Sequence, residues 1–81
     1  MRKYKCICCG YYTLEEEPNG SFEICPVCFW EDDNVQNKNE SYEGGANRIS
    51  LKEARENFRK FGASAKKYIA NVRKPLPDET L

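Results

Sequence analysis

Histidine is absent from this sequence, and so is any long apolar run. Without histidine, a metal site in this chain must take its ligands from sulfur or oxygen atoms. Without an apolar run of about 18 or more residues, no segment has the character of a membrane-spanning helix. Residues 1–6 are basic but have no apolar stretch behind them, so we expect no signal peptide, no membrane association and a cytoplasmic location.

Net charge is also absent, because 13 basic side chains balance 13 acidic ones. The chain therefore lacks the strong basic excess that is typical of nucleic-acid-binding domains. The charges are unevenly distributed: residues 1–45 hold four basic and nine acidic side chains, whereas residues 46–81 hold nine basic and four acidic ones. We interpret this as attraction between two halves that pack together. The alternative is that the basic half meets an acidic partner.

A large apolar core is lacking too. The chain has 81 residues, of which 40% are hydrophobic and 32% charged, so we expect a single domain whose core alone gives marginal stability. Domains of this size commonly add disulfides, a metal or a partner. Five cysteines are present. Their odd number and a reducing compartment favour metal binding over a disulfide framework.

Four of these cysteines form two pairs in the pattern Cys6-x2-Cys9-x15-Cys25-x2-Cys28. Two intervening residues allow a tight turn to direct both sulfurs at one point about 2.3 Å away, the length of a zinc–sulfur bond. A glycine after the first pair and a proline after Cys25 suit such turns. The pattern predicts one zinc ion held by four thiolates. The alternative, small buried hydrophobes, does not explain the paired spacing.

Four thiolates leave no position open for an exchangeable water, so we expect a structural metal and no catalysis. The first hypothesis is therefore a metal-stabilised interaction module with a protein partner. The second is electron transfer by an iron form of the same site, because tetrahedral sulfur ligation suits both metals. The third is nucleic-acid binding through the basic half, where Lys52, Arg55 and Arg59 share a helix face. The ordinary interpretation of that face is the polar side of an amphipathic helix.

Cys8 is the fifth cysteine, and it lies inside the first pair. We expect a spare thiol that packs against the turn. The alternatives are a reactive thiolate or a ligand that exchanges with Cys6 or Cys9. A reactive thiolate requires a lowered pKa and access, and the sequence indicates neither.

The sequence predicts a small α+β fold, in which a zinc-ribbon-like or rubredoxin-like hairpin lobe carries one or two C-terminal helices. Residues 11–14 and 21–24 are rich in strand formers and flank an Asn-Gly turn, so we expect them to pair as a hairpin within the metal-binding lobe, residues 4–30. A helical segment is expected at residues 50–74. Its first helix begins with a capping box at Ser50 and ends at Gly62.

The remaining segments are expected to be irregular or short. We predict a polar loop at residues 31–49 with few buried side chains and at most one turn near Val35. A second helix is expected from Ser64 to Val72, with inward positions at Ala65, Tyr68, Ile69 and Val72, followed by an extended tail at residues 75–81.

Two other features could carry function. Phe29 and Trp30 stand beside three acids, residues 31–33. We expect the two aromatics to shield the metal and the acids to be solvated. Residues 44–48 precede the capped helix and could hold a phosphate at its N-terminus. The preferred interpretation is a lead-in whose Asn47 and Arg48 bond across to the acidic lobe.

The two cysteine turns resemble those of rubredoxins and, more closely, the rubredoxin-like modules of rubrerythrins, although Phe29 replaces the glycine found after the second pair. Residues 6–10, 25–33 and 44–51, continued by 53–58, 61–63 and 72–75, resemble the bacterial cysteine-rich CPCC family over residues 4–79. The family's motif has proline where this chain has Ile7. The resemblance implies a small bacterial cysteine-rich domain and no particular activity.

Overall fold

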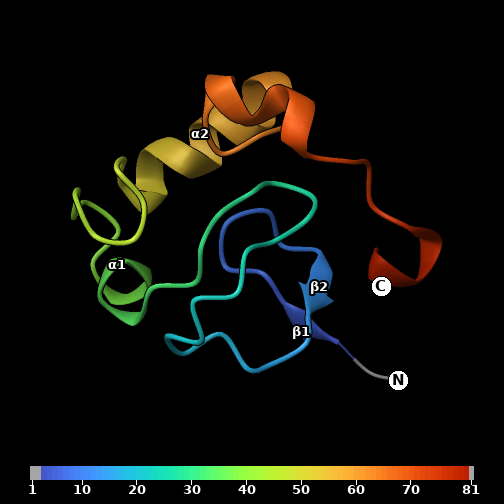
Figure 1. The fold of residues 1–81 in the computed structure, drawn as a ribbon, viewed down its shortest axis with the longest axis horizontal. Helices are drawn as coiled ribbons and strands as arrows, with labels where there is room; N and C mark the ends of the chain where they lie inside the picture. Colours follow the sequence, from blue (N-terminus) through green and yellow to red (C-terminus); the bar gives the residue numbers. More distant parts are fainter. Residues whose placement is uncertain (1–2, 81) are drawn as a thin grey trace.

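The computed structural model describes residues 3–80 and has the expected small α+β fold. In Figure 1 the helix of residues 34–38 lies at the left and that of residues 51–61 lies above the coil that follows and joins the strands, and the C-terminal segment returns beside the strands. None of the helices within residues 3–80 has the length and apolar character that a bilayer crossing requires. The elements are, in order, β1 (Tyr4–Lys5), β2 (Tyr12–Leu14), α1 (Asn34–Lys38), α2 (Leu51–Phe61) and two 3₁₀ helices, η1 (Lys66–Asn71) and η2 (Pro77–Glu79).

The predicted pairing of residues 11–14 with residues 21–24 is wrong. Strand β2 instead pairs antiparallel with β1, which precedes the first cysteine pair. Residues 21–24 meet the chain that follows the second pair: the Phe22 amide donates to the Asp32 carbonyl, and Ile24 forms an isolated bridge with Glu31. Each cysteine pair therefore lies at the tip of its own small hairpin, because a tight turn brings its two flanks together.

Helix α2 begins and ends where the sequence predicts. The Ser50 hydroxyl accepts a hydrogen bond from the Glu53 amide at 3.2 Å, which caps the first turn. Gly62 ends the helix in the left-handed region with φ 81°, and its amide donates to the Phe58 carbonyl. Leu51 and Ala54 on the apolar stripe are buried. The helix thus lays one face on the core.

The core is built around the cysteines rather than beside them. Four of the nine buried residues in its cluster are cysteines, so few aliphatic side chains are available to hold the fold together. Ile49 and Phe58 pack against this cluster from the α2 side. The cluster consists of Cys6, Cys8, Leu14, Cys25, Val27, Cys28, Trp30, Leu51 and Ala54.

The expectation that residues 31–49 bury few side chains is wrong. Asp32, Asp33 and Gln36 are all buried, and each makes several hydrogen bonds. Asp33 caps α1 by accepting from the Val35 and Gln36 amides through Oδ1, and its Oδ2 accepts from the Ala46 amide at 2.9 Å. Burial of these groups is tolerated because the chain supplies the bonds that water would otherwise make.

Gln36 is the centre of this polar network and is fully buried. Its Nε2 donates to the carbonyls of Tyr42, Asn47 and Ile49, and its Oε1 accepts from both the backbone and the side chain of Asn47. Asn47 in turn accepts from the Glu31 amide and donates to the Glu31 carbonyl. The short helix α1 and its network therefore fold a polar segment into one defined shape.

The segment after α2 differs from prediction in two ways. Residues 66–71 form the 3₁₀ helix η1 instead of an α-helix, and Ile69, expected to face inward, is 45% exposed. The tail is not extended, because Pro77–Glu79 form η2, which packs against β2. Glu79 is 3% exposed and accepts two 2.9 Å hydrogen bonds from the Arg73 guanidinium. This ion pair closes a turn within residues 73–79, and the packing of η2 against β2 places that turn on the hairpin.

Candidate metal centre

The two cysteine pairs have the same backbone geometry. In the first knuckle, residues 6–11, the Cys6 amide donates to the Tyr11 carbonyl at 2.8 Å and the Gly10 amide donates to the Cys6 carbonyl at 2.9 Å. The second knuckle, residues 25–30, repeats both bonds with the Cys25 amide and carbonyl at 3.0 and 2.8 Å. These repeated turns present two sulfurs each toward a common centre.

Phe29 takes the conformation that glycine takes in the first knuckle. Its φ is 71°, against 82° for Gly10 at the corresponding position. A side chain in this left-handed region costs about 1 kcal/mol, which glycine avoids. The Phe29 ring packs against Tyr68 with centroids 4.5 Å apart, so contact with η1 offsets part of that strain. Replacement of glycine by phenylalanine therefore leaves the knuckle intact.

The structure brings the four predicted ligands together. The sulfurs of Cys6 and Cys28 are 3.7 Å apart, those of Cys9 and Cys25 are also 3.7 Å apart, and all four lie within 4.8 Å of one another. A tetrahedral ion with metal–sulfur bonds of about 2.3 Å requires sulfurs separated by about 3.8 Å. All five cysteines are free thiols. The donor set thus fits one metal ion.

Access to this cluster is restricted. Cys6, Cys25 and Cys28 are buried, and only Cys9 among the four is partly exposed. The Thr13 hydroxyl lies 3.0 Å from the Cys25 sulfur, and the Val27 amide donates to the same sulfur at 3.4 Å. These donors stabilise thiolate charge that is shielded from water.

Crowding of the thiols separates their pKa values. Hydrogen bonds from Cys28, Cys6 and Cys9, with a further one from Thr13, lower the pKa of the Cys25 thiol far below its ordinary value. The hydrogen bond to Cys25 is also the main cause that raises the pKa of Cys9 and of Cys28. The Thr13 hydroxyl and the Val27 amide both lie against the Cys25 sulfur, which favours negative charge on that sulfur.

Cys8 does not join the four sulfurs. It is buried and belongs to the hydrophobic cluster, in agreement with the expectation of a thiol that packs against the turn. Ile7, which stands where the CPCC motif has proline, also packs against this cluster. The first knuckle is thus held by packing on both residues between its ligands.

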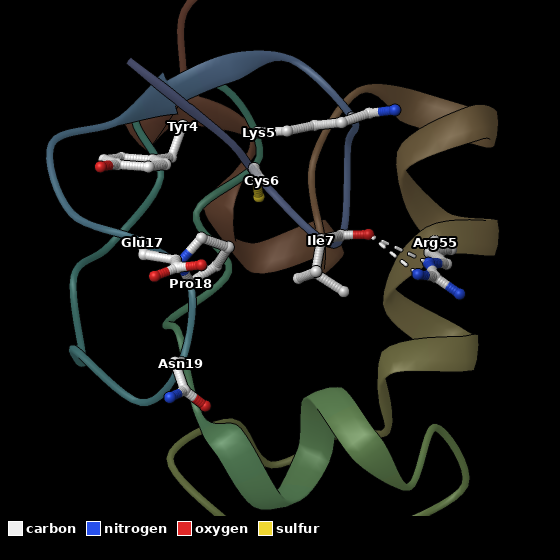
Figure 2. A pocket seen from close by; sticks show the side chains of 9 residues that line it. Tyr4, Lys5, Cys6, Ile7, Glu17, Pro18, Asn19 and Arg55 are labelled. Carbon is white, nitrogen blue, oxygen red and sulfur yellow. Dashed lines mark hydrogen bonds between the residues drawn. The ribbon is translucent and has the colours of Figure 1, made fainter. Parts of the chain in front are cut away.

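Distant segments attach to both knuckles, which the sequence did not indicate. The Arg55 guanidinium on α2 donates through Nε and Nη2 to the Ile7 carbonyl at 3.2 and 3.0 Å (Figure 2). The Ser64 amide donates to the Cys28 carbonyl at 2.7 Å, and the Arg73 amide donates to the carbonyl of Pro26 at 3.1 Å. The helical half is therefore bonded directly to the turns that carry the ligands.

Arg55 is partly engaged by contacts within the fold. Besides the Ile7 carbonyl, its guanidinium faces Glu40 with an N–O distance of 3.6 Å. Lys52 and Arg59 remain exposed on the same helix. The ion pair with Glu40 joins the basic half to the acidic half, as the charge distribution led us to expect.

The other candidate residues have structural roles. Trp30 is buried in the core and its Nε1 donates to Asn37, as expected for an aromatic that shields the site. Asp32, expected to be solvated, accepts from the Gly20 and Ser21 amides. Asn47 bonds across to Glu31 as predicted.

Residues 44–48 join the polar network, because the Ala46 amide donates to Asp33 and Asn47 donates to Gln36. Gly44 takes φ 86°, and its amide donates to the Arg48 carbonyl at 3.1 Å. The Arg48 side chain, expected to bond to the acidic lobe, is exposed. A Cβ atom at position 45 would lie 2.7 Å from Asp33 Oδ2. Glycine therefore allows the backbone at this position to approach the Asp33 carboxylate closely.

The fold and the cysteine cluster define a small cysteine-rich domain whose thiols are positioned to bind a metal ion. The Cysteine-rich CPCC family matches residues 4–79, nearly the whole chain. The protein belongs to this family. Among curated proteins, none matches the chain.

Proposed function

We propose that this protein is a non-catalytic interaction domain whose fold depends on one zinc ion bound by Cys6, Cys9, Cys25 and Cys28. The observation that carries the proposal is the sulfur geometry: two 3.7 Å pairs within a group no wider than 4.8 Å. Five free thiols suit a reducing compartment, so we place the protein in the cytoplasm.

A structural role follows from the donor set and the core. Four thiolates complete a tetrahedral shell and leave no position for a water or substrate. A bound metal would supply folding free energy here, because the cluster offers few aliphatic residues that could hold the two knuckles together. The chain's own residues fix the shell: Thr13 and Val27 donate to Cys25, and Arg55 holds the Ile7 carbonyl.

The experiment combines elemental analysis, a visible spectrum and a chelation series on natively purified protein. We expect one zinc per chain, no colour, and loss of the cooperative thermal transition when a chelator removes the metal. A Cys28→Ser variant should bind the metal weakly and be largely unfolded. A thermal transition that persists after complete metal removal would contradict the proposal.

Iron is the second candidate metal, and the backbone conformation of Phe29 is compatible with it. The second knuckle keeps the left-handed turn despite the missing glycine, so the departure from the rubredoxin pattern does not alter the sulfur geometry. The same purification separates the two metals. A red protein with charge-transfer bands in the visible spectrum would identify an electron-transfer site, whereas a colourless zinc protein ends that hypothesis.

A further inference from the structure

A cavity of about 680 Å³ opens beside the first knuckle. Its wall includes four consecutive residues, 4–7, together with residues 17–19 of the loop after β2 and Arg55 of α2 (Figure 2). A volume of this size falls in the range of small-ligand pockets, about 300–1,000 Å³. Of the four candidate ligands, Cys6 alone belongs to its lining, and Cys6 is 2% exposed.

The two sides of this cavity carry opposite charges. Figure 2 shows the Lys5 amine and the Arg55 guanidinium on one side, and the Glu17 carboxylate with the Tyr4 ring on the other. Lys5 and Glu17 are exposed and make no side-chain hydrogen bond or ion pair within residues 3–80. Arg55 is partly engaged by the Ile7 carbonyl and Glu40. One side therefore attracts an anion and the other attracts a cation.

We propose that this cavity binds a short extended peptide segment of a protein partner that carries one acidic and one basic side chain. The acidic group would lie toward Lys5 and Arg55. The basic group would lie toward Glu17 and the face of Tyr4, since aromatic rings attract cations. The proposal rests on the proposed function and names the partner class of an interaction domain.

A peptide fits this place because a strand lines it. Among the described residues, 3–80, the sheet has two strands, so β1 has one edge that β2 does not cover. Residues 4–7 all line the cavity, whereas no residue of β2 does. The Cys6 amide and carbonyl and the Ile7 carbonyl are already bonded within the fold, so the edge that a peptide can use is that of Tyr4–Lys5. An extended peptide can bond to backbone groups at such an edge, while the flanking charges select its side chains. Ile7 and Pro18 provide apolar contact between the charged sides (Figure 2).

The cavity adjoins the candidate metal centre. Cys6 and Ile7 belong to the first knuckle, and Arg55 reaches the cavity through its bonds to the Ile7 carbonyl. The wall is thus made of the same turn that the metal holds in place.

The test is a nuclear magnetic resonance titration of the ¹⁵N-labelled, metal-loaded protein. The probes are acetylated and amidated peptides with a lysine and a glutamate separated by one, two or three alanines. The matched neutral peptides carry glutamine at both positions. We expect saturable shifts centred on Lys5, Ile7, Glu17 and Arg55 for at least one charged peptide. The neutral peptide should bind about tenfold more weakly, because each exposed ion pair changes an affinity a few fold.

Variants locate the effect. Glu17→Gln and Lys5→Gln should each weaken binding a few fold, whereas Glu16→Gln and Lys52→Gln, exposed charges outside the lining, should not change it. Absence of saturable shifts up to about 10 mM of every charged peptide would overturn the inference. So would equal affinity for charged and neutral peptides. The chelation series tests the proposed function separately: a metal-dependent fold that binds no peptide leaves that function standing and ends the inference alone.

Discussion

The guanidinium of Arg55 bonds twice to the carbonyl of Ile7, a residue 48 positions earlier in the chain. This contact joins α2 to the first knuckle, between two of the candidate metal ligands. It makes the helical half and the cysteine lobe parts of one cooperative unit. Several consequences can be measured.

Replacing Arg55 should weaken the whole fold. Arg55→Met removes two charge-assisted hydrogen bonds and leaves the Ile7 carbonyl without them, which we expect to cost about 1–3 kcal/mol. Arg55→Lys should keep only part of the stability that Arg55→Met loses, because a lysine cannot donate in the fork geometry of a guanidinium. Chemical unfolding of the metal-loaded protein measures both, and Arg59→Met, on an exposed position of the same helix, serves as the control. If Arg55→Met and Arg59→Met lower the unfolding free energy equally, the charge on the helix alone is responsible.

Cys8 should be dispensable for metal binding. Cys8→Ala removes a buried thiol from the core, so the unfolding free energy should fall by about 1–2 kcal/mol while one metal ion per chain is retained. Cys9→Ala, at the partly exposed ligand position, should lose most of the metal. Elemental analysis after dialysis and thermal unfolding give the two readouts. A Cys8→Ala protein without metal would make Cys8 a ligand and contradict the assigned set.

Gly45 should resist every substitution. A Cβ there would lie 2.7 Å from Asp33 Oδ2 and 2.9 Å from Gln36 Oε1, so Gly45→Ala must push apart the buried network. We expect a loss of about 1–3 kcal/mol, the usual cost of overpacking. Gly44→Asn is the control, because nothing lies within 4 Å of its Cβ position and asparagine tolerates a positive φ. Urea unfolding measures the stability of both variants. Equal stability of Gly45→Ala and wild type would contradict the close approach of residue 45 to the Asp33 and Gln36 side chains.

The tail should loosen in acid. Hydrogen bonds from Arg73 hold the pKa of Glu79 below its ordinary value of 4.5. A carboxyl group with a depressed folded pKa contributes stability above its unfolded pKa and loses that contribution as pH falls through the folded pKa. The difference in unfolding free energy between wild type and Glu79→Gln should therefore be largest near pH 7 and shrink below about pH 4.5.

Metal-loaded samples and an exposed control make the pH experiment interpretable. Glu16→Gln removes an exposed acid of the same lobe and should differ little from wild type at every pH. Taking differences between variants at each pH cancels the loss of metal from protonated thiolates, which all share. The difference in unfolding free energy between wild type and Glu79→Gln is then compared across the pH range. If it stays constant, the ion pair with Arg73 does not set the stability of the tail.

Much of the site could be read from local sequence. The four candidate ligands follow from the spacing of the cysteines, and the ends of α2 follow from Ser50 and Gly62. Both features depend on residues a few positions apart, whose geometry covalent connection restricts. The hairpin prediction was wrong because strand formers at residues 21–24 have two possible neighbours. Propensity does not distinguish between them, and the turn of the second knuckle selects residues 31–32.

By itself the sequence determined which sulfurs can meet and where the capped helix lies, because short-range spacing and capping chemistry act within a few residues. Only the tertiary structure decided that Gln36 is buried, that Arg55 faces the first knuckle and that Glu79 pairs with Arg73. Buried polar side chains need partners for their hydrogen bonds, and those of Gln36 and Arg55 lie in other segments of the chain. Those partners become visible only once the chain has folded around its cysteines.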